Sequence, residues 1–115
     1  MKAYTDLEQS KKLAEILPLE SADMHYATWT ILDGEFIVFP NQGSTIENLQ
    51  EDYGNQIIPC WSLAALLSVY PMVVGRDMGM YCCWQNSKNL HSRHYDNPVD
   101  ACVEMILKLH ELNLI

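Results

Sequence analysis

A thiol and an imidazole, the two groups that a cysteine nucleophile uses, occur close together in the C-terminal third of the chain. Cys83 precedes His91 and His94, and Asp96 follows them. An imidazole that takes the thiol proton makes the sulfur a strong nucleophile, and a carboxylate can orient the imidazole. These four residues define one hypothesis, a small enzyme or ligand-binding domain. No glycine-rich turn that would form an oxyanion hole stands beside the cysteine, so we assign no catalytic residue.

The same segment offers thiol, imidazole and carboxylate groups that bind metal ions. Cys82, Cys83 and Asp96 are the nearest possible companions of His91 and His94. The chain lacks the Cys-x-x-Cys and His-Glu-x-x-His patterns that are typical of zinc sites. Neighbouring residues on a strand point to opposite faces, so Cys82 and Cys83 are poorly placed to hold one ion. We therefore expect no metal and no cofactor, and four free, mostly buried thiols.

The segment that holds the histidines is also the most basic part of an acidic protein. Lys88, His91, Arg93 and His94 would together form a positive patch that receives a phosphate or a carboxylate. The alternative is a polar hairpin tip followed by an edge strand, where cationic side chains prevent strand-to-strand aggregation. We favour the alternative, since no phosphate-binding glycine loop accompanies these cations.

The net charge of −8 is unevenly distributed. Residues 1–52 carry ten carboxylates and three lysines, a balance of −7, whereas residues 53–115 have a balance of −1. This acidity argues against binding to nucleic acid, whose affinity comes from neutralising phosphates. An acidic surface suits a basic protein partner, and mimicry of DNA is a further alternative. Solubility is the simplest explanation of the charge.

Three strands and a helix would position these candidate residues. Residues 72–75, 80–85 and 90–95 have the composition of strands and are separated by turn-forming residues, which predicts a three-stranded meander. Residues 97–115 predict a helix that Asn97 caps and that has Pro98 at its first position. Apolar residues occupy most of the circumference of this helix, so we expect it to be buried on more than one side.

Residues 25–39 predict a β-hairpin. Asp33-Gly34 is a strong signal for a two-residue turn, which would place Leu32 opposite Glu35 and Trp29 opposite Val38. In this register Ala27, Trp29, Ile31, Phe36 and Val38 share a core face. The other face is half apolar, and its exposed apolar residues would form an interface with another element or subunit. The predicted interface residues are Tyr26, Leu32, Ile37 and Phe39.

Three further helices are predicted ahead of the meander. Residues 5–8 and 44–47 both have the capping-box pattern, and each precedes apolar residues at helical spacing. The third helix lies within residues 60–70 and stops before Pro71. Residues 1–115 therefore predict a single α+β domain, in which an antiparallel sheet, composed of a hairpin and a meander, packs against about four helices.

Two stretches carry a resemblance to a known group of proteins. Residues 58–67 (IPCWSLAALL) and 96–112 (DNPVDACVEMILKLHEL) resemble segments of small uncharacterised proteins of gut anaerobic bacteria and of their phages and mobile elements. Those proteins carry no assigned activity, so no catalytic residue can be transferred. The resemblance implies an accessory gene in a bacterial cytoplasm, with phage origin as one possibility.

The sequence thus favours a protein that binds another protein over an enzyme. We expect a cytoplasmic, non-catalytic accessory protein whose partner is another protein or a second copy, in a homodimer. No apolar run approaches the roughly 18 residues that a membrane helix needs, so we expect no membrane association.

Overall fold

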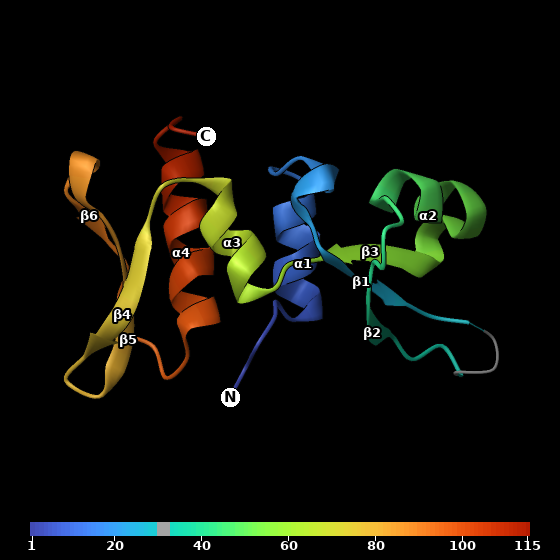
Figure 1. Cartoon of the computed structure of the whole chain (residues 1–115), viewed down its shortest axis with the longest axis horizontal. Coiled ribbons are helices and arrows are strands. Elements are labelled where there is room, and N and C mark those ends of the chain that lie inside the picture. Colours follow the sequence, from blue (N-terminus) through green and yellow to red (C-terminus); the bar gives the residue numbers. More distant parts are fainter. Residues whose placement is uncertain (30–32) are drawn as a thin grey trace.

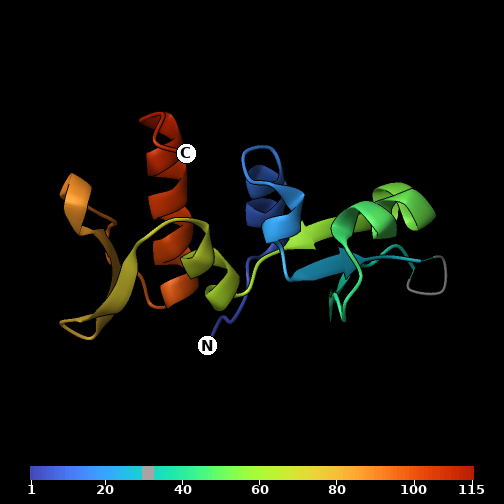
Figure 2. The same ribbon diagram turned by 45° about the horizontal axis from the view of Figure 1, so that its top comes forward.

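The computed structural model describes residues 1–29 and 33–115. Within these residues the chain forms four α-helices and two antiparallel, three-stranded sheets, which confirms the predicted α+β class. The molecule is elongated, with principal extents of 45 × 29 × 23 Å. The sheets lie at its two ends, and α1, α3 and α4 lie between them (Figure 1), an arrangement that is also clear in the rotated view of Figure 2.

Helix α4 (Pro98–Glu111) confirms the prediction from its sequence. The Asn97 side chain accepts a hydrogen bond from the Asp100 backbone N–H, and Pro98 occupies the first turn. Both features reduce the number of unpaired backbone N–H groups at the N-terminus of the helix, and neither needs a partner from another part of the fold. The helix packs against β5 on one side and α3 on another, so its wide apolar arc is covered. Its fully buried residues include Val99, Cys102, Met105, Ile106 and Leu109.

The second sheet is the predicted meander, with strand order β4-β5-β6. Its strands are β4 (Val73–Asp77), β5 (Met80–Gln85) and β6 (Leu90–His91). The β4–β5 turn consists of Met78 and Gly79, whose positive φ values of 53° and 82° fit a tight two-residue hairpin. β6 is shorter than predicted, and beyond it the backbones of Tyr81 and Tyr95 pair as an isolated bridge.

The first sheet contains the predicted hairpin strands and a third strand that the sequence did not suggest. β1 (Met24–Ala27) lies between β2 (Ile37–Pro40) and β3 (Ile57–Cys60), and both neighbours are antiparallel to it. β3 contains Pro59, which is usually a sign against a strand. It is tolerated here because β3 is an edge strand, where a missing N–H costs little.

The predicted register of the hairpin is wrong. In the structure Ala27 pairs with Ile37 and His25 with Phe39, a shift of three residues from the pairing of Trp29 with Val38. An odd shift exchanges the faces, so Tyr26 lies on one face while Ile37 and Phe39 lie on the other. Tyr26 therefore does not share a face with Ile37 and Phe39, as the predicted interface required. Leu32 lies outside the described residues. Asp33 and Gly34 have the positive φ values that a tight turn requires, but the two strands pair only as far as Ala27 and Ile37, so the connection is longer than the predicted two residues.

The remaining helices are α1 (Leu7–Ala14), α2 (Ile46–Tyr53) and α3 (Leu63–Val69). α2 is close to its prediction, but its cap is Thr45 and not Ser44, the first residue of the predicted capping box. The cap of α1 is Asp6 and not Thr5, since the Asp6 carboxylate and the Gln9 side chain satisfy each other's backbone N–H groups. Short 3-10 turns lie at Leu19–Ser21, Gly54–Gln56 and Asn86–Lys88. None of the helices in the described residues is long and apolar enough to cross a membrane.

Thr5 and Trp61 tie the N-terminal segment to the strand-to-helix connection between β3 and α3. The backbone N–H of Thr5 donates to the Trp61 carbonyl at 2.9 Å, and the Trp61 N–H donates to the Thr5 hydroxyl at 3.1 Å. Both residues are fully buried. The buried apolar residues form a continuous cluster that extends from Ile46 in α2 to Cys83 in β5. One core therefore connects the two ends of the molecule.

Candidate functional site

The predicted thiol–imidazole group is not assembled in the structure. Cys83 has no exposed surface and belongs to the core cluster beneath β5. Its backbone pairs with that of Ser92, whose hydroxyl accepts a hydrogen bond from the Cys83 N–H at 2.9 Å. His91 pairs with Trp84, the residue after Cys83, so the His91 side chain lies on the opposite face of the sheet from the Cys83 thiol. The geometry does not support proton transfer between them.

The thiol of Cys83 is directed at the helix and not at the solvent. A hydrogen bond with Cys102 of α4, together with burial, raises the pKa of Cys83 far above its ordinary value. A thiol with a raised pKa is protonated at neutral pH and is a weak nucleophile. Cys60, Cys82 and Cys102 are also free and buried. The cysteines therefore act as small core residues, as the sequence favoured.

The cations of the predicted anion patch have acidic neighbours. The Arg93 guanidinium contacts the Glu104 carboxylate at 2.6 Å, and the His94 ring lies 3.0 Å from the Asp77 carboxylate. Lys88 and Asp96 are exposed, at two separate connections. The predicted residues therefore do not converge on one pocket. A search of the described residues for groups of three or more metal-ligating side chains found none.

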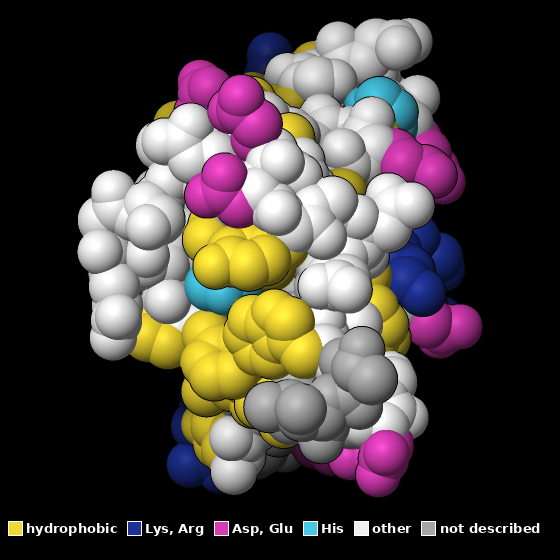
Figure 3. Space-filling view, turned by 90° about the vertical axis from the view of Figure 1, so that its right-hand side faces the viewer, with side chains coloured by type: hydrophobic (Ala, Val, Ile, Leu, Met, Phe, Trp, Pro, Cys, Tyr) yellow, Lys and Arg dark blue, Asp and Glu magenta, His cyan; other side chains and the backbone are white. Residues whose placement is uncertain are grey.

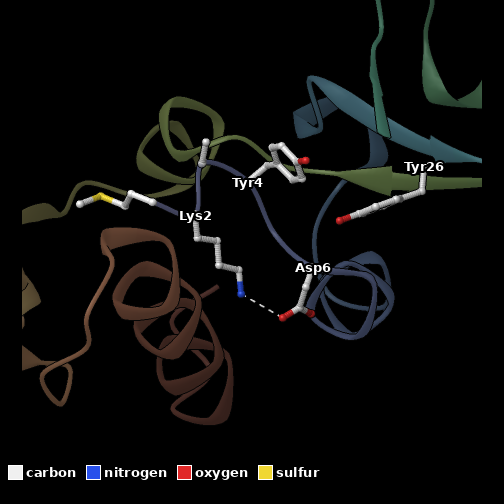
Figure 4. Close-up of a pocket in the computed structure, with 6 residues that line it drawn as sticks. Lys2, Tyr4, Asp6 and Tyr26 are labelled. Carbon is white, nitrogen blue, oxygen red and sulfur yellow. Dashed lines mark hydrogen bonds and ion pairs between the residues drawn. The ribbon is translucent and has the colours of Figure 1, made fainter. Parts of the chain in front are cut away.

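A small pocket lies at the N-terminus, beside α1 (Figure 4). It has a volume of about 250 Å³, and the residues that line it are Met1, Lys2, Ala3, Tyr4, Asp6 and Tyr26. The Lys2 ammonium lies 2.9 Å from Asp6 and 2.8 Å from Asp100. The Tyr26 hydroxyl donates to the Thr5 carbonyl, and burial raises the pKa of this phenol to about 12. These polar groups of the pocket are bonded to other groups of the protein, so we interpret the pocket as a junction between segments of the fold and not as a ligand site.

The Asp100 carboxylate, which contacts Lys2 at this junction, predicts that the folded protein loses stability in acid. Partial burial alone would raise the pKa of Asp100, but hydrogen bonds from Lys2, Asn97 and Gln9 outweigh it and lower the pKa. A carboxylate with a lowered pKa stabilises the fold above its unfolded pKa, and this contribution is lost as the pH falls through the folded value. We expect the free energy of unfolding, measured with urea, to fall below about pH 4.

The Asp100→Asn variant should show a smaller decrease between pH 7 and pH 3 than the wild-type protein, because the titrating group is gone. Glu111→Gln, an exposed change at the other end of the same helix, is the matched control and should keep the wild-type pH dependence. An unchanged acid sensitivity in Asp100→Asn would contradict this assignment.

A second cavity, somewhat larger than the N-terminal pocket, lies at the opposite end of the molecule from the predicted thiol–imidazole residues. It has a volume of about 300 Å³ and lies between the first sheet, the turn after β2, and α2. Hydrophobic side chains gather beside a histidine in the middle of this end (Figure 3). We call this cavity the aromatic pocket; its lining residues are His25, Trp29, Phe39, Pro40, Asn41, Gln42, Ser44, Leu49, Tyr53 and Ile57.

The aromatic rings of the pocket pack in a chain. The ring centroids of His25 and Phe39 are 5.8 Å apart, with the rings stacked at 27°. Trp29 meets Phe39 edge-on at 5.7 Å, and it meets Tyr53 at 6.2 Å and 89°. The corrected β1–β2 register causes the first contact, since it pairs His25 with Phe39 directly. Because the rings face different directions, they form walls and not one flat surface.

A polar turn fixes the closed side of the pocket. Asn41 donates its amide to the Ala22 carbonyl at 3.0 Å, which leaves its oxygen 2.8 Å from Nδ1 of His25. Because the Asn41 side-chain oxygen can only accept a hydrogen bond, Nδ1 of His25 is the donor in this contact. His25 is only 7% exposed, so its ring is a fixed wall. This side of the pocket is therefore held in place by hydrogen bonds of the protein itself.

Helix α2 provides the open side. Leu49 and Tyr53 are separated by one turn and share the face toward the sheet. Ile46, one turn earlier, is 1% exposed and anchors the helix to the core, whereas Tyr53 is 47% exposed. An aromatic ring held against Trp29 yet open to solvent is a typical contact residue in protein interfaces.

The predictions from the sequence include several residues of this pocket but do not place them in one site. Phe39 was predicted as an interface residue, and Leu49 and Tyr53 were predicted on one helix face. Trp29 was assigned to the core face, and His25 was not assigned to any site. The missing information was the register of β1 and β2, which the local sequence does not encode.

Comparisons with protein-family models, with curated proteins and with solved structures found no match to this chain. The resemblance to proteins of gut bacteria and their phages accordingly stays a prediction. The site must be interpreted from its own geometry.

Proposed function

We propose that this protein is a cytoplasmic, non-catalytic binding protein that engages a partner protein through the aromatic pocket. The observation that carries the proposal is the combination of three aromatic side chains, Trp29, Phe39 and Tyr53, around one cavity. Aromatic residues are enriched at the energetic centres of interfaces, because they bury a large area with few rotatable bonds.

The size of the cavity supports recognition of a side chain and not of a large cofactor. Its volume of about 300 Å³ is at the lower end of the range for small-molecule sites, roughly 300–1,000 Å³. Neutral polar groups of Asn41, Gln42 and Ser44 at its edge would bond to the backbone of an inserted segment. No strong acid–base pair lines the cavity, so its residues favour binding over catalysis.

Selection of short random peptides displayed on phage, with the purified protein as bait, would test this function. We expect the recovered peptides to bind the Trp29→Ala and Tyr53→Ala variants at least about tenfold more weakly, as for hot-spot residues. Affinities would be measured by isothermal titration calorimetry.

Met78→Ala is the matched control, because Met78 is a 95% exposed apolar residue at the β4–β5 turn, on the other end of the molecule. It should retain full affinity, and circular dichroism should show that all three variants are folded. Peptides that bind both pocket variants as tightly as the wild-type protein, or a failure to recover any peptide, would overturn the proposal.

A further inference from the structure

We infer that the aromatic pocket receives a cationic side chain, preferentially an arginine, from a basic segment of the partner protein. This inference rests on the proposed function and specifies the chemistry of the partner. It follows from two independent features, the charge distribution along the chain and the arrangement of the pocket rings.

The first feature is the absence of basic residues from the part of the chain that builds the pocket. Residues 13–75 contain eight carboxylates and neither a lysine nor an arginine. This interval includes the whole first sheet, α2 and each residue that lines the pocket. The next basic residue is Arg76, in the second sheet at the far end of the molecule. The part of the chain that builds the pocket therefore carries charged side chains of negative sign alone.

Acidic residues are also exposed on the helix that contributes to the pocket, although none of them lines the pocket itself. Glu47, Glu51 and Asp52 are exposed on α2, the helix that contributes Leu49 and Tyr53 to the pocket. Figure 3 shows acidic side chains above the hydrophobic cluster, with basic ones only toward the edges of the view. This potential attracts a cationic segment before contact, and it opposes an acidic one.

The second feature is the arrangement of the rings. A cation binds over the face of an aromatic ring, and tryptophan and tyrosine faces attract it best. Trp29 and Tyr53 are perpendicular, and Phe39 is inclined at 65° to Trp29, so the three rings that line the cavity are not parallel to one another. Arginine fits better than lysine, because its planar guanidinium stacks on rings and is more weakly hydrated.

The same features argue against the other occupants. A two-fold homodimer through this face would place two copies of the same anionic surface against each other. Nucleic acid would be repelled for the same reason. A neutral apolar side chain would fill the cavity but would leave the negative charge of the surrounding segments without a role.

A matched pair of peptides tests the inference directly. The probe is an acetylated and amidated glycine–serine peptide with one central arginine, compared with the same peptide that carries citrulline, which has nearly the same shape without the charge. We expect the arginine peptide to shift the indole N–H NMR signal of Trp29, assigned with Trp29→Phe, and to bind at least about tenfold more tightly. A lysine peptide should rank between them.

Charge reversal on the protein supplies the second arm. Asp52→Lys, next to Tyr53 in α2, should weaken binding of the arginine peptide several-fold, whereas Glu111→Lys, an equal change of net charge at the end of α4, should not. Equal affinity for the arginine and citrulline peptides, or no shift of the Trp29 signal at millimolar peptide, would overturn the inference.

The two proposals fail in different ways. If the phage-selected peptides depend on Trp29 and Tyr53 but are neutral or acidic, the cationic inference is wrong and the binding function stands. If no selected peptide depends on these residues, the binding function itself is wrong.

Discussion

Replacing Trp61 by alanine is expected to lower the free energy of unfolding by about 3–5 kcal/mol. Trp61 is fully buried, and it lies where the N-terminal segment, β3 and α3 meet. Its indole N–H donates to the Ser21 hydroxyl at 2.9 Å, so the ring is held by a polar contact as well as by packing. Alanine would remove both and leave a cavity at the centre of the core that joins the two ends of the molecule.

Urea unfolding followed by circular dichroism measures this loss. Trp61→Phe should lose less than Trp61→Ala, because the apolar ring remains and chiefly the hydrogen bond to Ser21 is removed. Tyr53→Ala is the surface control, with an expected loss below about 1 kcal/mol because Tyr53 is 47% exposed. A loss of less than about 1 kcal/mol in Trp61→Ala would show that the junction is not a stabilising centre.

Replacing Ile106 by alanine is expected to cost about 2–5 kcal/mol. Ile106 has no exposed surface and lies in the middle of α4, which packs between β5 and α3. Neighbouring buried residues of the helix, Cys102 and Leu109, are fixed by the sheet and by α3, so the cavity cannot collapse easily.

Ile106→Val should cost only about 0.5–1.5 kcal/mol, since it removes a single methyl group. Leu112→Ala is the matched control at the C-terminal end of the helix, where Leu112 is 51% exposed, and it should change stability by less than about 1 kcal/mol. Equal losses for Ile106→Ala and Leu112→Ala would mean that α4 is not the central helix described above.

The pocket variants and the core variants separate function from stability. Tyr53→Ala and Trp29→Ala should abolish most peptide binding with a folded protein, whereas Ile106→Ala should reduce stability without a direct effect on the pocket. This separation is possible because the pocket lies at one end of the molecule and the second sheet packs against α4 at the other (Figure 1).

The elements whose signals are local were predictable. α4 has its cap, its first-turn proline and its apolar arc within one short segment, and α2 has its capping threonine and the terminating Gly54. The β4–β5 meander was predicted for the same reason, because a tight turn joins strands that are adjacent in the sequence. Each of these patterns acts over a few residues, so the sequence alone determines it.

The first sheet required the tertiary structure. β3 follows β2 only after α2, and its pairing with β1 uses the same four residues that pair with β2. The central strand must satisfy both neighbours at once, which the Asp33-Gly34 turn cannot specify by itself. The observed register differs from the expected one by three residues, and this difference exchanges the faces of the sheet.

The sequence by itself determined the α+β class, the cap of α4, the buried thiols and the acidic character of the N-terminal half, because composition and short-range spacing encode these properties. Only the tertiary structure decided which side chains share a surface. It separated Cys83 from His91 by the two faces of one sheet, and it brought Trp29, Phe39 and Tyr53 from three segments into one pocket. The physical reason is that a site depends on strand register and helix packing, and these are fixed by contacts between residues far apart in the chain.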